Sequence, residues 1–161
     1  MSVVRLSDRS LMYAVHVFSA DKVKSAPFYT SPYGYRLRAS LFPSGTGSGE
    51  DTHLSIYIRV IAGDYDALLD WPFRLPISVI LYDQDAQKRQ HVVESFVPST
   101  SCKQFQRPSR ESTGSDSVSG VGFGYPRFLS LEQLRAGSYV RDDTIFVKFK
   151  VEQTLPIVEH C

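Results

Sequence analysis

The sequence has 161 residues, 42% of them hydrophobic and 22% charged, which is typical of one globular domain rather than of a disordered chain. The 18 Lys and Arg residues nearly balance the 17 Asp and Glu residues, so the net charge of +1 offers no broad attraction for nucleic acid or an anionic membrane. No apolar run approaches the roughly 18 residues that cross a bilayer, and the polar N-terminus is unlike a signal peptide. We therefore expect a cytoplasmic protein with no nucleic-acid partner and no direct membrane insertion.

Four stretches alternate apolar and polar residues with the period of two that is typical of half-buried β-strands. They occupy residues 35–41, 54–60, 77–81 and 145–151. Each stretch has one apolar face that must be covered, and the sequence contains no long amphipathic helix that could cover it. Two sheets that face each other are therefore predicted.

The connections fit this arrangement. Residues 43–49 form a glycine-rich turn between the first two strong strands, which favours a hairpin. A phosphate-binding loop would require a helix after the glycines, and here a strand follows. Residues 107–120 read as a long loop. One short helix is predicted after Ser130, because Ser130 and Gln133 have capping-box spacing, Leu131 and Leu134 share a face, and Gly137 can end the helix.

The residues that commonly carry chemistry do not form a metal-binding or catalytic pattern. The four histidines are His16, His53, His91 and His160, and the two cysteines are Cys102 and Cys161. A structural zinc site usually takes four such ligands in paired short spacings, which this chain lacks. There is no Gly-x-Ser-x-Gly motif, and a lone Cys102 is more often a packed or exposed thiol than a nucleophile. We expect no metal, no cofactor and no enzymatic activity.

An acidic cluster keeps a carbohydrate-binding hypothesis open. Asp64, Asp66 and Asp70 lie close to Trp71 in the sequence, and a pair of carboxylates is typical of glycosidases. The neighbouring pair Asp142-Asp143 would point to opposite faces of an extended chain, so it cannot line one site. Turn and strand-end roles fit these aspartates better.

Several segments occur in the order of a known family. They are residues 28–35, 45–49, 52–55, 64–73, 81–84, 105–108, 122–125 and 139–146, and they include the run Asp-Tyr-Asp-Ala-Leu-Leu-Asp-Trp-Pro-Phe at 64–73. This ordered set resembles the C-terminal MATH domain of the tumour-necrosis-factor receptor-associated factors, the TRAF family. Within the family, the Phe-Gly-Tyr segment at 123–125 and the pair Ser40 and Phe42 look most similar to the branch of the fourth member, with a secondary similarity to the sixth.

The resemblance implies an all-β fold, an eight-stranded antiparallel sandwich with one short helix. It divides the chain into a divergent N-terminal segment (1–27), the MATH domain (28–153) and a C-terminal tail (154–161). The family's first strand, with its Trp-x-Ile signature, is missing, and residues 11–18 are the candidate replacement. Without one, the sandwich would expose a sheet edge that could pair with another chain.

The resemblance also implies a groove for short extended peptides at one edge of the sandwich, bound as an added strand. The residues that match the groove are Ser40, Phe42, Thr46, Tyr57, Phe96, Cys102, Lys103, Gln104, Phe123, Gly124 and Tyr125. Tyr33 matches an oligomer-contact position. Receptor-binding branches carry Arg and Asp where this chain has Ser40 and Thr46, and three serines at 102–104, so we expect an altered peptide motif.

The expected function is that of a signalling adaptor domain, whose partners are peptides from receptor cytoplasmic tails or adaptor proteins. A homotrimer is expected to be weak, because the sequence has no coiled-coil heptads. The alternative is a substrate-recruiting module for a separate ubiquitin ligase, since two cysteines cannot fill a zinc-binding RING. A carbohydrate-binding sandwich is the more distant alternative.

Overall fold

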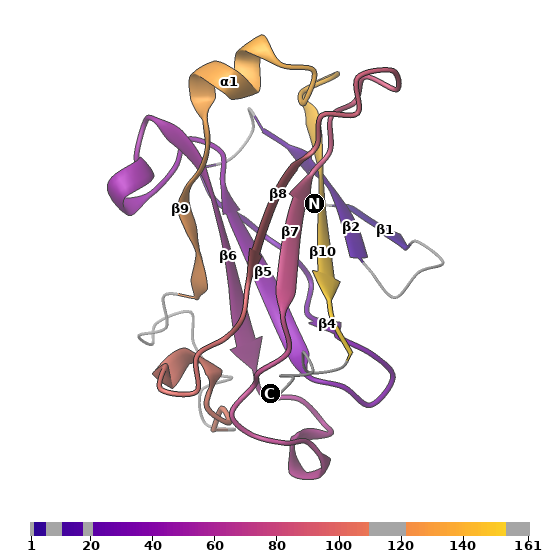
Figure 1. The fold of residues 1–161 in the computed structure, drawn as a ribbon, viewed down its shortest axis with the longest axis vertical. Coiled ribbons are helices and arrows are strands. Elements are labelled where there is room, and N and C mark those ends of the chain that lie inside the picture. The colour runs from indigo at the N-terminus through magenta and orange to yellow at the C-terminus, as the bar shows by residue number, and fades with distance from the viewer. Residues whose placement is uncertain (1, 6–10, 18–20, 110–121, 154–161) are drawn as a thin grey trace, which may run out of the picture.

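The computed structural model describes residues 2–5, 11–17, 21–109 and 122–153. These residues form two antiparallel sheets that pack face to face, with one short helix at one end (Figure 1). The predicted all-β sandwich is confirmed. None of the helices in these ranges is long and apolar enough to cross a membrane.

The first sheet has the strand order β1-β2-β10-β7-β8. Its strands are β1 (Ser2–Arg5), β2 (Leu11–His16), β10 (Thr144–Val151), β7 (Ile77–Leu81) and β8 (Val92–Phe96). The candidate replacement strand at 11–18 contains β2, which pairs with β10 in antiparallel register from Leu11 to His16. Residue 18 and residues 154–161 lie outside the described residues.

The second sheet has the order β3-β5-β6-β9. Its strands are β3 (Val23–Lys24), β4 (Phe28–Tyr29), β5 (Arg36–Phe42), β6 (His53–Ile61) and β9 (Phe123–Ser130). Because β3 and β4 both pair with β5 on the side opposite β6, they act as one interrupted strand. Counted in this way, the described residues hold the eight expected strands, and the short strand β1 is an addition at the edge of the first sheet.

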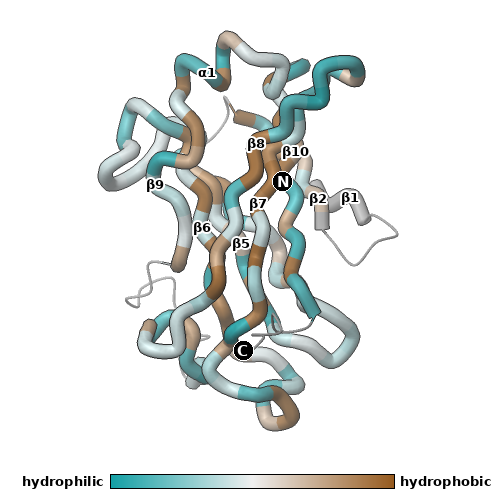
Figure 2. The backbone as a smooth tube through the Cα atoms, in the orientation of Figure 1, coloured by the Kyte–Doolittle hydropathy of each residue, from teal (hydrophilic) through white to brown (hydrophobic). Residues whose placement is uncertain are grey.

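The core lies between the two sheets and is built from the predicted alternation. The inward side chains of β5, β6, β7 and β10 are buried, and they are Leu37, Ala39, Leu41, Leu54, Ile56, Ile58, Val60, Ile77, Val79, Leu81, Ile145, Val147, Phe149 and Val151. Figure 2 shows hydrophobic positions recurring along the central strands. Burying this apolar area from water is the main force that holds the sheets together.

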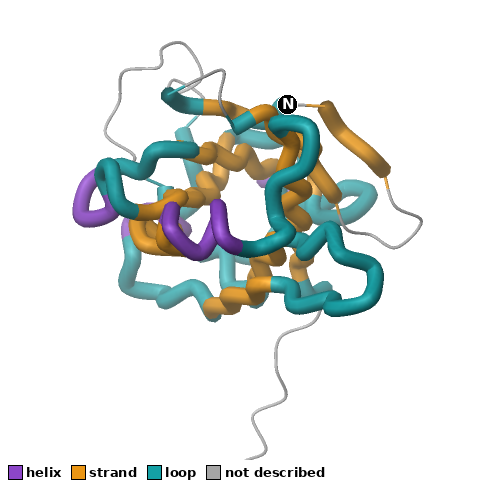
Figure 3. Tube along the Cα trace, turned by 90° about the horizontal axis from the view of Figure 1, so that it is seen from above, coloured by secondary structure: helices purple, strands orange, loops and turns teal. Residues whose placement is uncertain are grey.

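Helix α1 (Leu131–Ala136) crosses one end of the sandwich, as the view from above shows (Figure 3). The predicted cap is present, because the Ser130 hydroxyl oxygen accepts a hydrogen bond of 3.1 Å from the backbone N–H of Gln133. Leu134 is buried against the core. Gly137 does not adopt a left-handed conformation. A side chain there would collide with the ring of Tyr139, 2.5 Å from the Cβ position.

The loops that the structure describes contain three short 3-10 helices, and two of these helices border the strands discussed below. They are η1 (Gly47–Gly49), η2 (Asp66–Leu68) and η3 (Lys103–Phe105). Helix η1 lies in the predicted glycine-rich hairpin between β5 and β6, and η3 follows β8.

Candidate functional site

The last strands of the two sheets, β8 and β9, form the edge where the predicted site residues gather. Each of these strands pairs with a neighbour on one side only, among the strands that the structure describes. Phe96 on β8 and Phe123 on β9 bring the two strands together, with ring centroids 4.0 Å apart. Their register partners, Ile77 and Ile58, are buried, so both phenylalanines lie on the inward faces of their sheets.

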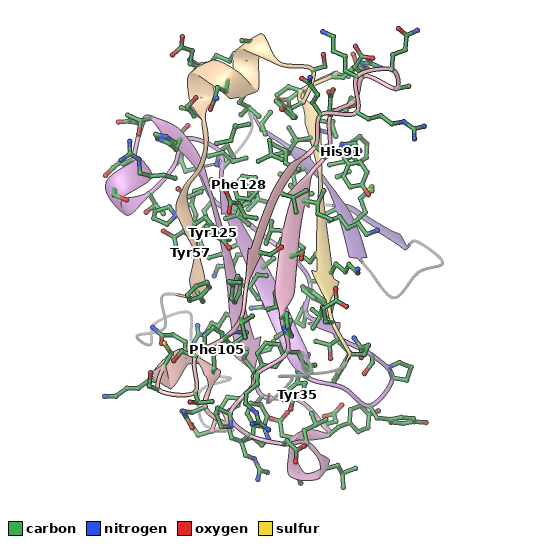
Figure 4. The ribbon with its side chains drawn as sticks, viewed as in Figure 1. Tyr35, Tyr57, His91, Phe105, Tyr125 and Phe128 are labelled. Atoms are coloured by element: carbon green, nitrogen blue, oxygen red, sulfur yellow. The ribbon has the colours of Figure 1, made fainter. Side chains whose placement is uncertain are left out.

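Five aromatic side chains form a continuous group at this edge, which we call the edge cluster: Phe96, Phe105, Phe123, Tyr125 and Phe128. Centroid distances between contacting rings run from 4.0 Å (Phe96–Phe123) to 6.5 Å (Phe123–Tyr125). Phe105 and Phe128 are buried, whereas Phe96, Phe123 and Tyr125 are only partly buried. Figure 4 shows Tyr125 and Phe128 along β9. Phe105 lies toward the end of the sandwich that is opposite helix α1. The cluster therefore offers partly exposed aromatic surface between the two end strands.

Gly124 separates the two aromatic residues of β9 and lies on the other face of the sheet. A Cβ atom at this position would lie 2.1 Å from the carbonyl oxygen of Ile56 and 2.9 Å from Cδ1 of Tyr57. Only glycine allows β6 and β9 to approach this closely. The Tyr57 ring consequently lies beside the β9 backbone (Figure 4), and burial raises the pKa of its hydroxyl.

The register divides the predicted site between the two faces of the second sheet. Ser40 pairs with Tyr57, and Tyr57 pairs with Gly124, so these three form one row across the outer face. Phe123 and Tyr125 face the core instead, together with Phe96. The family resemblance predicts that all of these residues line one groove. Because side chains alternate along a strand, an added strand beside β9 would contact both groups.

Phe42 extends the outer-face group. Its ring centroid lies 5.9 Å from that of Tyr57. The ammonium group of Lys22 lies 5.2 Å from the centroid of the Phe42 ring, in a cation–π contact. Sequence reasoning missed Lys22, because it precedes β3 and no local motif connects it to Phe42.

Thr46 lies in the turn at the end of β5, and that turn is fastened to β9. The backbone N–H of Thr46 donates to Ser55 Oγ at 3.0 Å, and the Ser55 hydroxyl donates to the carbonyl oxygen of Pro126 at 2.6 Å. Gly49 packs so closely against β9 that a Cβ atom on it would lie 1.8 Å from the carbonyl oxygen of Pro126. The glycine-rich turn thus holds β9 in place.

A β-bulge interrupts β9 at this contact. Ile56 pairs with Tyr125 and Leu54 with Leu129, so residues 126–128 lie opposite Ser55 alone. Pro126 has no N–H to donate and fits a bulge at an edge strand. Pairing with β6 is therefore regular over residues 123–125, the predicted aromatic pair and its glycine, and resumes at Leu129 and Ser130.

Cys102, Lys103 and Gln104 lie at the start of η3, where the backbone N–H of Phe105 donates to the Cys102 carbonyl oxygen at 3.2 Å. Phe105 anchors this turn in the edge cluster, and its own carbonyl oxygen accepts from the N–H of Phe73 at 2.7 Å. Lys103 and Gln104 are exposed, and Cys102 is partly buried. The three predicted residues therefore lie beside the edge cluster.

Glu94 is a further residue that sequence reasoning missed. It pairs with the buried Val79, so it lies on the inward side of the edge strand β8, yet it is exposed. The pKa of Tyr125 is raised, mainly by burial and in addition by the negative charge of Glu94. An inward-pointing charge on an end strand discourages indiscriminate sheet pairing.

Tyr33 lies in the turn between β4 and β5, separate from the edge cluster. Its side chain is 70% exposed, and its ring contacts Tyr65 at a centroid distance of 5.1 Å. The residue has a positive φ of 63°, which is uncommon outside glycine.

The aspartates of the carbohydrate hypothesis have structural contacts. Asp66 is buried and accepts from the N–H of Gly63 at 3.0 Å, while its backbone carbonyl accepts from the indole N–H of Trp71 at 2.8 Å. Asp64 accepts from the Tyr29 hydroxyl at 3.1 Å. No group of three or more His, Cys, Asp or Glu side chains that could hold a metal ion occurs within residues 2–5, 11–17, 21–109 and 122–153.

Comparison with known proteins is consistent with this geometry. The family described as "TRAF/meprin, MATH domain" matches residues 20–148. TNF receptor-associated factor 5 of Mus musculus is 42% identical over 134 residues, which cover 82% of this chain and 23% of the relative. TNF receptor-associated factor 1 of Homo sapiens is 42% identical over 130 residues, which cover 80% of this chain and 29% of the relative. The chain thus spans less than a third of the length of these relatives.

A solved structure with the description "Notothenia coriiceps TRAF5" matches the fold. Its TM-score is 0.81 at 33% sequence identity, over 92% of this chain and 75% of that one. The matches support the family as a whole and do not single out the branch of the fourth member. The two-sheet fold and these matches agree, and the chain belongs to the TRAF/meprin MATH domain family.

Proposed function

We propose that this MATH domain binds short extended peptides from receptor cytoplasmic tails or adaptor proteins, which add as a strand to the open edge of β9. The domain is a non-catalytic binding module of the kind found in signalling adaptors, and its action would be cytoplasmic. The observation that carries the proposal is the alternation along residues 123–125. Two partly buried aromatic side chains face inward on either side of Gly124, which has no side chain on the outer face and lies against the Tyr57 ring.

Strand addition would use both groups of the divided site. Backbone hydrogen bonds to β9 would supply affinity that depends little on sequence, and alternate side chains of the peptide would supply the preference. Inward-facing side chains would meet Phe123, Tyr125 and Phe96. Outward-facing side chains would pass over Gly124 toward Tyr57, Phe42 and Ser40.

The expected peptide differs from the receptor motifs of the related branches. Flat aromatic surfaces at Phe123 and Tyr125 suit a proline or another small apolar residue. Ser40 and Thr46 supply no charge, where receptor-binding branches have Arg and Asp. Cys102, Lys103 and Gln104 would contact a polar side chain through η3, in place of three serines. This altered set is consistent with the predicted similarity to the fourth member's branch.

Assembly into a trimer would be weak in this chain and would involve Tyr33. The 70% exposure of this tyrosine supports a contact role, because large exposed aromatic side chains are common at protein interfaces. The proposed domain boundaries of 28 and 153 leave β2 outside, although it pairs with β10. The segment 1–27 would therefore act as part of the folded unit by supplying the replacement strand.

The direct test is an array of short peptides with Pro-x-Glu and Ser/Pro-x-Gln-Glu cores, probed with the purified chain. Phe123→Ala should abolish selective binding and keep the fold. Phe146→Ala is the matched control, because Phe146 is also partly buried but lies on β10, on the outer face of the first sheet.

Equal binding by Phe123→Ala and the wild type would reject the site. A blank array with a folded protein would instead favour recruitment of substrates to a separate ubiquitin ligase.

A further inference from the structure

The outer face of the first sheet carries apolar side chains at its centre. The inward residues of its strands are buried, so the alternate residues of β2, β7, β8 and β10 point outward. Ile80 pairs with Val93 on one side and with Lys148 on the other. Lys148 in turn pairs with Met12. These four outward side chains form one row across the sheet, in which the lysine is the only polar member.

A second row beside it is also largely apolar. Phe146 pairs with Ala14, and the backbone N–H of Tyr82 donates to the Phe146 carbonyl oxygen at 2.9 Å. The Tyr82 ring contacts the His91 ring, at a centroid distance of 4.4 Å. Val93 is 55% exposed, and the other side chains of both rows are partly buried. The two rows form a continuous apolar surface over β2, β7, β8 and β10, which we call the sheet face.

The outer face of the second sheet is different. Arg36, Arg38 and Arg59 point outward from its central strands β5 and β6, as is usual for a face in contact with water. The described helices also pack on this second sheet, where α1 and η1 contact β6 and β9. Since α1 crosses the end of the sandwich (Figure 3), no described helix lies over the sheet face. An uncovered apolar patch of this kind is typical of an interaction site.

The charges of the sheet face have one sign. Lys148 and Lys150 point outward from β10, and no carboxylate occupies an outward position on the described strands β2, β7, β8 and β10. Lys150 lies 3.1 Å from Glu152, which follows β10. Lys148 forms no ion pair with any described residue. The sheet face is therefore an apolar surface with an unpaired positive charge among its apolar side chains.

These features restrict the kind of partner. Strands β7 and β10 each pair with a neighbour on both sides, so a partner must contact side chains and cannot add as a strand there. Two copies of the sheet face would bring their lysines together, and like charges oppose such an interface. A helix meets both requirements, because helices cover sheet faces with one apolar stripe. A carboxylate within that stripe would complement Lys148.

We propose that the sheet face binds an amphipathic α-helix of a partner protein, whose apolar stripe includes a glutamate or aspartate that pairs with Lys148. The apolar residues of the helix would pack on Ile80, Phe146 and Met12. This site lies on the face of the first sheet and uses neither Phe123 nor Tyr125, so it is independent of strand addition at β9.

The test is a selection from a displayed library of helical peptides of about 18 residues against the purified chain. The polar positions of the peptides are fixed, and positions i, i+3, i+4, i+7 and i+11 vary among apolar residues, Glu, Gln and Lys. The selected helices should carry Glu within an apolar stripe. Replacing this Glu by Gln should weaken binding about fivefold. Ile80→Ala in the domain should weaken binding about tenfold, because apolar contact is lost.

Charge reversal gives the sharpest result. Lys148→Glu should lose the selected helix and bind the same helix with Lys in place of Glu. Lys148→Gln should lose the discrimination between Glu and Gln without reversing it. Two controls should bind the helix as the wild type does: Arg135→Glu, which makes the same change of charge on the exposed side of α1, and Phe123→Ala. Because Lys148 points outward, its variants should melt at the wild-type temperature.

Three outcomes would overturn the proposal. The first is that no helix is enriched, or that Lys148→Glu still binds the enriched helices. The second is that Phe123→Ala loses the helices, since they would then bind at the β9 edge. The third is that the wild type sediments as a dimer that Lys148→Glu dissociates, which would replace the helix by a second copy of this chain.

Discussion

The aromatic rings of this domain form a connected set that is buried at one end and partly exposed at the other. We call these two parts the closed end and the open end. At the closed end, Phe73 is 0% exposed, and its ring contacts Tyr35 at 4.8 Å and Phe105 at 6.2 Å. At the open end, Phe123 and Tyr125 belong to the same connected set of rings but remain partly exposed. The residue type is the same at both ends, so residue type alone does not separate structural from binding roles.

The difference comes from what covers each end. The loop with η3 lies over the closed end and is held by the hydrogen bond from the Phe73 N–H to the Phe105 carbonyl oxygen. The open end lies between strands β8 and β9, which have no further strand beside them among the described residues. Coverage by a neighbouring loop or strand therefore decides which aromatic surface is available.

The largest expected effect comes from truncating the closed end. Phe73→Ala should lower the free energy of unfolding by about 3–5 kcal/mol, because it leaves a cavity in a fully buried site. Phe123→Ala should lower it by roughly half as much, since part of its surface already contacts water. Denaturant unfolding measures both values. Equal losses of unfolding free energy in the two variants would show that Phe73 and Phe123 stabilise the fold to the same extent. That result would contradict the difference between the two ends.

A smaller effect is expected from Gly124→Ala, which tests the close approach at the open end. The new methyl group would lie 2.1 Å from the Ile56 carbonyl oxygen, so β9 must shift, at about 1–3 kcal/mol, and peptide binding should weaken. Gly47→Ala is the control. It has a positive φ of 59° but no atom within 4 Å of the Cβ position, so we expect a loss near 1 kcal/mol and unchanged binding. Intact binding by Gly124→Ala would contradict the account.

The smallest effect concerns charge at the open end. Glu94→Gln should lower the pKa of the Tyr125 hydroxyl, because it removes the negative charge that opposes ionisation. The pKa should stay above the ordinary value, since burial is the larger cause. Titration of assigned tyrosine ring signals by NMR measures the change. An unchanged pKa would mean that Glu94 and Tyr125 do not face each other across the edge.

The sequence predicted the strands best where apolar and polar residues alternate and the apolar side chains are buried in the core. Residues 35–41, 54–60, 77–81 and 145–151 have their apolar side chains inside, and the Ser130 cap begins the predicted helix. Strand β8 was harder, because Val93 on this edge strand is 55% exposed and interrupts the pattern. The cross-strand registers that oppose Arg38 to Arg59 could not be read from local sequence, since they depend on pairing between separate strands.

The candidate site was predicted residue by residue through family resemblance, but its division was not. Knowing that Ser40, Tyr57 and Gly124 share one face, and that Phe123 and Tyr125 share the other, requires the register of three strands. The bulge at 126–128 likewise lies opposite Ser55, which is far from Pro126 in the chain and donates a hydrogen bond to its carbonyl oxygen.

The most direct test of strand addition is a backbone N-methylation scan of a peptide that binds. Each methyl group removes one N–H donor, and only alternate residues of an added strand direct their N–H toward β9. The account predicts losses of about tenfold at every second residue and little change between them. A uniform loss, or losses that follow side-chain type without alternation, would contradict the binding of a peptide as an added strand on β9.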